Sequence, residues 1–257
     1  MAADTTLYDA FALTPAGELV AFVGGGGKTT LMFALARELA AAGRRTVVTT
    51  TTRLGSGQVH LAPALCHPAE LVGPDRDALS RHLDRHRLCL IAGTIVEDKA
   101  KGVALDLPGR LLARPDVDDV LVEADGAQEL PVKAPAAHEP ALPLQTTLLV
   151  PVAGIDALEG PIIAVAHRPE LVSRIVKRPR SQPLRPLDLA LLLVHSQGGL
   201  KDAPADARVV PFINKVESER QLASAQEAAF LAMRHARVDR VIIGAAQQAQ
   251  PVRDVIT

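Results

Sequence analysis

The sequence predicts an α/β protein built on a mainly parallel sheet with helices on both faces. Short apolar runs alternate along the chain with longer segments whose apolar residues recur every three or four positions, and this alternation is typical of consecutive βαβ units. Four consecutive glycines separate the first apolar run from the first helical segment. The length of 257 residues fits one large domain, so we expect a single domain over 1–257.

Strands are expected where apolar or β-branched residues run together between turn signals. In chain order they are 18–23, 45–50, 87–92, 119–123, 146–152, 208–213 and 238–244. The strand at 45–50 is favoured by its β-branched residues. The strand at 146–152 is interrupted by Pro151, which has no amide hydrogen for a sheet ladder.

Helices are expected where the apolar spacing changes to about 3.6 residues. In chain order they are 29–42, 75–86, 105–113, 168–177, 186–194 and 217–235. The helix at 29–42 stops at Gly43, a residue type that readily terminates helices. Residues 154–206 contain two of these helices, several prolines and no clear strand, so we expect them to form a helical insertion.

The composition is that of a cytoplasmic globular protein. A net charge of −1 gives no basic surface for a nucleic-acid backbone, and 2% aromatic residues provide few platforms for stacking bases. The two cysteines, Cys66 and Cys89, make no disulfide framework and no thiolate metal cage, which favours a reducing compartment. No signal peptide and no apolar run of about 20 residues are present. We therefore expect no nucleic-acid partner and no membrane association.

The glycine-rich segment reads GGGGKTT and lies between an expected strand and an expected helix, where a phosphate-binding loop belongs. Glycines let the backbone aim its amides at phosphate oxygens, and the helix N-terminus adds positive potential. We expect Lys28 to reach the β- and γ-phosphates and the Thr29 hydroxyl to ligate Mg²⁺. The expected nucleotide-binding residues of this loop, in a unit expected to be P-loop NTPase-like, are Gly24, Gly25, Gly26, Gly27, Lys28, Thr29 and Thr30.

The loop departs from the common pattern G-x-x-x-x-G-K-[ST], because Phe22 stands where the first glycine is usual. Its shorter form, G-x-x-G-K-T-T, resembles the loop of the Mur-type amide-bond ligases, which bind ATP. Three functions stay open on this evidence. They are a Mg²⁺-dependent nucleotide-binding accessory enzyme or chaperone, an ATP-dependent ligase or kinase acting on a small molecule, and a nucleotide-gated binding protein with little turnover.

Two acidic residues follow the strand at 119–123. Glu123 and Asp125 would stand at the carboxyl edge of the sheet, where a P-loop protein holds Mg²⁺ through water or polarises the attacking water. Thr29, Glu123 and Asp125 are therefore the expected metal-binding residues. Arg53 follows the threonine-rich strand and could meet a phosphate or a developing negative charge. The expected catalytic residues are Lys28, Arg53, Glu123, Asp125 and His138.

His138 belongs to the segment LPVKAPAAHEP, which follows the acidic strand. Its prolines stiffen the chain, so Lys133, His138 and Glu139 are held on a poorly mobile loop. A cation, an imidazole and a carboxylate beside a phosphate site could bind a second substrate or move a proton.

Asn214, Lys215 and Glu217 resemble the guanine-reading motif Asn-Lys-x-Asp, in which a carboxylate accepts from two donors of guanine. Glutamate stands here in place of aspartate, and its extra methylene leaves the choice between GTP and ATP open. Gly244 and Ala245 follow about thirty residues later, where G proteins keep a second base-contacting loop. The alternative is an ordinary strand-to-helix turn with Asn214 as the helix cap.

Six segments, in the same order, resemble the YqeC family of selenium-cofactor biosynthesis proteins, also described as accessory proteins of selenium-dependent molybdenum hydroxylases: GGGGKTT, TTTTR, LVEADGA, LPVKAPAAHEP, HRPE and INKVE. The resemblance implies a nucleotide-binding accessory role in maturing a selenium- or molybdenum-containing hydroxylase cofactor. Its partners would be a molybdenum hydroxylase or other cofactor-maturation proteins. The family has Lys or Arg after ADGA, where this chain has Gln128.

Overall fold

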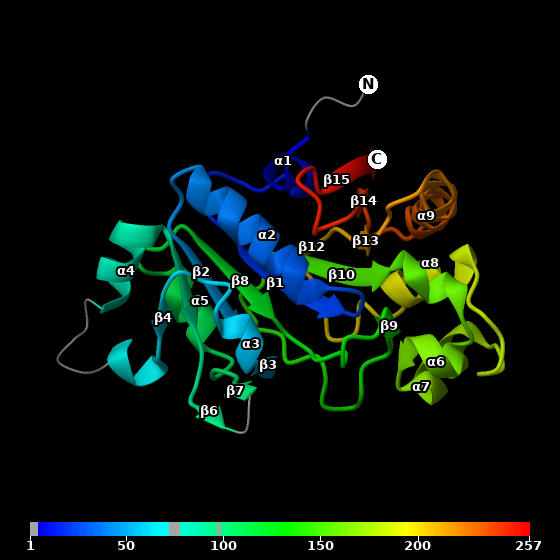
Figure 1. The fold of residues 1–257 in the computed structure, drawn as a ribbon, viewed down its shortest axis with the longest axis horizontal. Coiled ribbons are helices and arrows are strands. Elements are labelled where there is room, and N and C mark those ends of the chain that lie inside the picture. The colour runs from blue at the N-terminus through cyan, green and yellow to red at the C-terminus, as the bar shows by residue number, and fades with distance from the viewer. Residues whose placement is uncertain (1–4, 72–77, 97–98) are drawn as a thin grey trace.

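A twisted, mostly parallel sheet runs through the centre of the molecule, seen in a computed structural model that describes residues 5–71, 78–96 and 99–257 (Figure 1). In this described part of the chain the sheet has ten strands. Nine of them lie in the order β15 (Val252–Ile256), β14 (Val241–Gly244), β13 (Phe212–Asn214), β10 (Leu148–Gly154), β1 (Leu19–Gly24), β8 (Asp119–Glu123), β2 (Thr46–Thr50), β5 (Leu88–Ile91) and β4 (Leu65–Cys66), and β12 (Arg208–Val209) also pairs with β10. Among the described pairings of this sheet, β15 alone is antiparallel, so the predicted parallel arrangement is confirmed.

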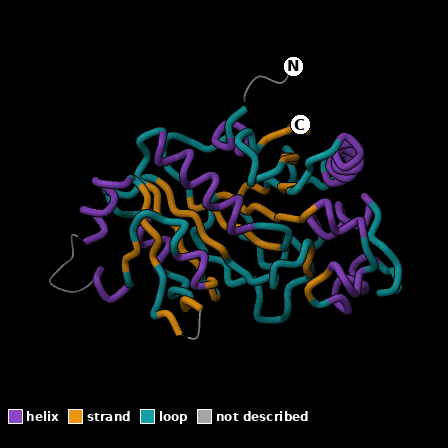
Figure 2. Tube along the Cα trace, viewed as in Figure 1, coloured by secondary structure: helices purple, strands orange, loops and turns teal. Residues whose placement is uncertain are grey.

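Helices cover both faces of the sheet (Figure 2). They are α1 (Leu7–Phe11), α2 (Lys28–Ala41), α3 (Ser56–Val59), α4 (Ala78–His86), α5 (Leu107–Leu112), α6 (Ile162–Val165), α7 (Pro169–Val176), α8 (Pro186–Val194) and α9 (Glu219–Ala232), with 3₁₀ turns at Pro68–Leu71 and Ile155–Glu159. The expected helix at 75–86 is seen from Ala78 onward, and its first residues lie outside the described part.

The side chains of β1 alternate between the two faces, as a strand requires. Val20 and Phe22 pack in one core with α1 and α2, whereas Ala21 and Val23 pack in another with α7, α8 and α9. Leu19 joins a third core, together with α4 and α5. The strand is therefore buried on both sides, which explains its unbroken apolar sequence.

Two expectations for the second half of the chain are wrong. The strand expected at 208–213 is divided into β12 and β13, because Pro211 lies in the gap and supplies no amide hydrogen for the ladder. Conversely, Pro151 does not interrupt β10, which continues to Gly154.

Residues 154–206, expected to form a helical insertion, contain α6, α7, α8 and a 3₁₀ turn, but also a strand that was not expected. The strand is β11 (Ala166–His167), which pairs in parallel with β9 (Val132–Lys133). A small antiparallel sheet elsewhere joins β3 (Arg53–Gly55), β7 (Lys99–Lys101) and β6 (Ile95–Val96). Within the described ranges, no helix is long and apolar enough to cross a bilayer.

Candidate functional site

The segment between β1 and α2 is a tight loop packed against backbone on two sides. Gly24, Gly26 and Gly27 have φ angles of 98°, 72° and 100°, which side-chain-bearing residues rarely adopt. A Cβ on Gly26 would lie 2.0 Å from the amide nitrogen of Gly154, and one on Gly25 would lie 2.7 Å from the carbonyl oxygen of Leu130. Glycine is therefore required by both conformation and space.

The amides of this loop divide into two groups. Those of Gly24, Gly25 and Gly26 donate within the protein, to the Asp125 carboxylate and to the carbonyls of Val152 and Leu130 respectively. The amides of 27–30 precede the first hydrogen bond of the helix, from Leu31 N to Gly27 O. These are the amides that an α-helix leaves without an internal acceptor, and such a helix N-terminus suits an anion.

Lys28 and Thr29 meet the end of β8. The Thr29 hydroxyl donates to Glu123 Oε2 at 2.5 Å. Lys28 Nζ donates to the carbonyl of Gly24 at 2.7 Å and lies 3.9 Å from Glu123 Oε1. Burial raises the pKa of the Glu123 carboxyl, against the opposing effects of Lys28 and Thr29. The register of the sheet brings these side chains together, because Phe22 of β1 lies directly beside Glu123 of β8.

The threonine-rich segment at the end of β2 contacts Glu123 from the side opposite β1. The Thr50 hydroxyl and the Thr51 amide both donate to the carbonyl of Glu123, at 3.0 and 3.1 Å. The threonines therefore contact the carboxyl edge of β8 through their backbone and hydroxyl groups.

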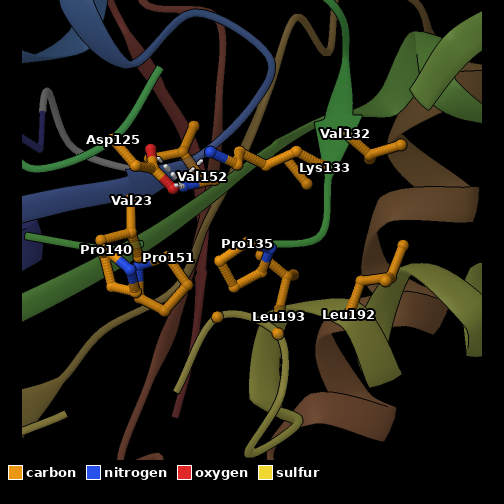
Figure 3. A pocket seen from close by; sticks show the side chains of 14 residues that line it. Val23, Asp125, Val132, Lys133, Pro135, Pro140, Pro151, Val152, Leu192 and Leu193 are labelled. Atoms are coloured by element: carbon orange, nitrogen blue, oxygen red, sulfur yellow. Dashed lines mark hydrogen bonds and ion pairs between the residues drawn. The ribbon is translucent and has the colours of Figure 1, made fainter. Parts of the chain in front are cut away.

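Asp125 pairs with two lysines. Its carboxylate accepts from the Gly24 amide and lies 3.2 Å from both Lys28 Nζ and Lys133 Nζ. Figure 3 shows Asp125 and Lys133 pointing toward each other beside a small cavity. The cavity has a volume of about 20 Å³, room for about one water molecule, and is otherwise walled mainly by prolines and aliphatic side chains.

Lys133 continues into a second group of charges. Its Nζ donates to Glu139 Oε2 at 2.7 Å and to the carbonyl of Gly126 at 2.6 Å. Arg168 grips Glu139 with two guanidinium hydrogen bonds. Burial alone would raise the pKa of Glu139, but hydrogen bonds from Arg168 and Lys133 outweigh it and bring the pKa to about 2. Burial lowers the pKa of neighbouring His167, and Arg168 and Lys133 act in the same direction.

Two expected catalytic residues lie apart from this cluster. Arg53 is exposed at the start of β3, and His138 is exposed in the turn before Glu139. Across the described residues, no hydrogen bond or ion pair joins either side chain to Lys28 or Glu123. His167, which was not among the expected catalytic residues, lies next to Lys133 and Arg168.

Asn214 ends β13 and is buried against the phosphate loop. Its Nδ2 donates to the carbonyl of Gly26 at 2.8 Å, and its Oδ1 accepts from the amide of Ala246 at 2.9 Å. The cap of α9 is Ser218, so the alternative of Asn214 as helix cap is wrong. Asn214 instead ties the loop after β1 to the segment after β14.

The rest of the expected base-binding motif is more open. Lys215 Nζ donates to Asp156 Oδ2 at 2.7 Å, beside the loop. Glu217 is exposed and lines an open hollow of about 800 Å³ together with Ala245, Gln248 and Arg253. An adjacent hollow of about 490 Å³ is lined by Thr30 and by residues 246–249.

Arg168 is a site residue that the sequence pattern does not predict, because Arg-Pro-Glu is also a common helix start. Its partner Glu139 is 29 residues away, and periodicity carries no signal for such a pair. One signal was available: Lys133, Glu139 and Arg168 all lie in the segments that carry the family resemblance.

Comparison with known proteins agrees with these motifs. The family model described as YqeC protein matches residues 20–170. The Escherichia coli (strain K12) relative named "Uncharacterized protein YqeC" is 30% identical over 231 residues, which cover 90% of this chain and 88% of that protein. Among solved structures, FtsY from Mycoplasma mycoides matches with a TM-score of 0.35 at 10% identity, over 96% of this chain and 69% of that one. On the family model and the Escherichia coli relative, the chain belongs to the YqeC family.

Proposed function

We propose that this protein binds a nucleoside triphosphate with Mg²⁺ at residues 24–30 and hydrolyses or transfers its terminal phosphoryl group. The observation that carries the proposal is the meeting of Lys28, Thr29 and Glu123 beside the unpaired amides of a helix N-terminus. Oriented amides, a lysine, and a hydroxyl beside a carboxylate are what a triphosphate and its metal ion require.

Thr29 and Glu123 fit a magnesium ion, because Mg²⁺ takes oxygen ligands and is commonly held by one or two protein groups together with water and phosphate. Their oxygens are already 2.5 Å apart, in a buried position next to the loop. Bound there, Mg²⁺ would neutralise charge on the β- and γ-phosphates. Asp125, the third expected metal ligand, is paired with Lys28 and Lys133, which already compensate its charge.

If Glu123 does not ligate the metal ion, it is instead the group that could hold a proton. Burial raises the pKa of its carboxyl in the metal-free site, and there the carboxylate could orient or deprotonate an attacking water. Lys28 would stabilise negative charge on the transferred group.

The nucleoside would lie on the side of the loop next to Asn214 and Ala246. Asn214 holds that side in place, Lys215 pairs with Asp156 beside it, and the carboxylate of Glu217 lines the open hollow. GTP and ATP are both candidate ligands for this arrangement.

A second candidate is an ATP-dependent ligase or kinase acting on a small molecule. The short G-x-x-G-K-T-T loop favours it, as does the segment with Lys133, His138 and Glu139 that runs directly behind the loop. The two candidates differ in their product, since hydrolysis releases phosphate to water whereas a ligase or kinase forms an acyl- or substrate-phosphate.

In the cell, we infer that the protein acts as a single cytoplasmic domain in maturing a selenium- or molybdenum-containing hydroxylase cofactor, with the hydroxylase or other maturation proteins as partners. Membership of the YqeC family supports this role. A deletion strain should lose hydroxylase activity, and wild-type protein should restore it where Lys28→Ala does not. Equal restoration by both would overturn the nucleotide-dependent role.

The binding proposal is tested by thermal unfolding with ATP, GTP, CTP and their diphosphates, each with and without Mg²⁺. A ligand that binds only the native state raises the melting temperature by mass action, so preference appears as a ranked shift. The variant Thr29→Val keeps the shape and removes the hydroxyl, so it should lose the Mg²⁺-dependent part of the shift. Absence of any shift in the wild type overturns the proposal.

A further inference from the structure

Five charged side chains of alternating sign run from the phosphate loop to the insertion: Lys28, Asp125, Lys133, Glu139 and Arg168. The successive closest distances between their charged atoms are 3.2, 3.2, 2.7 and 2.6 Å. We call these five residues the charge chain. It joins segments that are far apart in sequence, from the N-terminus of α2 to the N-terminus of α7.

The charge chain is largely shielded from water. Exposed side-chain fractions are 3% for Lys28, 2% for Asp125 and 0% for Lys133, rising to 22% only at Arg168. Charges interact more strongly in such surroundings than at a surface, where ion pairs contribute little. A change at one member therefore alters how strongly each neighbouring member pairs with its other partner.

The ammonium group of Lys28, which would have to bind a phosphate, already has partners within the protein. Its Nζ donates to the carbonyl of Gly24 and pairs with Asp125. To reach a phosphate it must loosen the pair with Asp125. Asp125 would then keep the Gly24 amide and have Lys133 as its remaining cation. Lys133 would in turn be drawn away from Glu139.

The far end of the charge chain is attached to the insertion. Lys133 lies in β9, directly beside His167 of β11. The next residue, Arg168, is the N-cap of α7 and has a φ of 62°, in the left-handed region. A non-glycine residue there is strained, and its two hydrogen bonds to Glu139 help to hold it. Weaker contact with Glu139 would thus be felt at the start of α7.

We propose that the charge chain couples phosphate binding at Lys28 to the position of β11 and α7, so that the insertion regulates nucleotide affinity and responds to it. The inference rests on the proposed function, because it assumes that a phosphate group binds at Lys28. Coupling of this kind is reciprocal: whatever a ligand does to α7, a change at α7 does to the ligand.

Alternating charge makes a prediction about sign. Glu139→Gln removes one of the two carboxylates that attract Lys133, so Lys133 pairs more strongly with Asp125. Asp125 then holds Lys28 less strongly, and phosphate affinity should rise severalfold. Lys133→Met removes one of the two cations that attract Asp125, so Asp125 holds Lys28 more strongly. Phosphate affinity should therefore fall severalfold. Arg168→Gln makes Glu139 attract Lys133 more strongly, which draws Lys133 away from Asp125. Phosphate affinity should therefore fall, by a smaller factor. Arg174→Gln, an exposed arginine on the same helix, serves as the control and should change nothing.

The affinities are measured by titration calorimetry with inorganic tripolyphosphate and with the Mg²⁺ complexes of ATP and GTP. Hydrogen exchange of 166–176 is followed with and without the same ligands. We expect opposite shifts for Glu139→Gln and Lys133→Met, and a ligand-dependent change in exchange in the wild type. Affinity changes of the same sign in these two variants would overturn the coupling. Hydrogen exchange of 166–176 that is the same with and without ligand would also overturn it. A wild type that binds none of these ligands instead overturns the proposed function.

Discussion

Asn214 and Gly26, 188 residues apart in the chain, are joined by a buried hydrogen bond of 2.8 Å from the Asn214 amide to the Gly26 carbonyl. The other side of the same amide accepts from Ala246. One side chain thus connects the ends of β1, β13 and β14 at the edge where the nucleotide is proposed to bind.

Replacing this bridge should cost stability and binding together. Asn214→Ala leaves the Gly26 carbonyl and the Ala246 amide without partners, and each unpaired buried group costs about 1–3 kcal/mol. We expect a fall of about 2–6 kcal/mol in the free energy of unfolding, measured in urea, and weaker nucleotide binding. Asn214→Asp should be no better, because an oxygen would face the Gly26 carbonyl. Glu227→Ala, at an exposed position on α9 that lines neither hollow, is the control and should behave as the wild type.

Lys28→Ala should remove nucleotide-induced stabilisation, since Lys28 is the proposed phosphate ligand. It should also lower the stability of the ligand-free protein, because it takes one cation from a buried pair with Asp125. Loss of one partner of a buried pair typically costs about 3–5 kcal/mol, and Lys133 should reduce that cost here. Thermal unfolding with and without nucleotide measures both effects. The exposed Lys101→Ala is a matched control, and a full nucleotide shift in Lys28→Ala would contradict the phosphate-loop assignment.

Glu123→Gln should impair Mg²⁺-dependent turnover while sparing the fold. Glutamine keeps the shape and can still accept from Thr29, but it cannot take up a proton or provide the charge. Turnover is measured as phosphate release at saturating Mg²⁺, and circular dichroism checks the fold. Unchanged turnover would exclude Glu123 from the chemistry.

The same substitution predicts a difference in pH dependence. Burial raises the pKa of Glu123 in the folded state above its unfolded value of about 4.3, so folding favours its protonated form. That relative stability is present below the unfolded pKa and is lost as pH rises through the folded pKa. The wild type should therefore lose stability relative to Glu123→Gln as pH rises from about 4 toward neutrality. Denaturation in urea across this range tests it, and parallel pH profiles would contradict the assigned direction.

The sequence predicts the parts of this molecule that depend on local pattern. Alternating apolar runs predict β1, β8 and β10, and GGGGKTT predicts the loop between β1 and α2. The two-residue strands β9 and β11 escape such prediction, because two residues show no period. The short edge strand β15 also escaped, although its antiparallel partner β14 was expected.

The long-range contacts at the site could not be predicted from the sequence for a different reason. The pattern places Lys28 at a helix start but does not show that it is buried against Asp125. It places His138 next to Glu139, yet the turn leaves His138 exposed and brings Arg168 to Glu139 instead. Which side chain fills such a position depends on how distant segments pack, and a single sequence without aligned relatives carries no record of that.

The last prediction concerns the choice of base. A carboxylate can pair with two neighbouring donors of guanine and finds no matching pair on adenine, so loss of Glu217 should weaken GTP binding selectively. Because Glu217 is exposed, the expected penalty is that of one net hydrogen bond to a charged group, about 1.5–3 kcal/mol at most. Glu217→Asp, which restores the length usual in the guanine-reading motif, should keep or improve GTP affinity. Titration calorimetry with GTP and ATP measures both variants against the wild type, with the exposed Glu227→Ala on α9 as control. If ATP binds more tightly than GTP and Glu217→Ala changes neither, Glu217 does not read the base. The short phosphate loop, with its likeness to the Mur-type ligases, then becomes the better guide to the reaction.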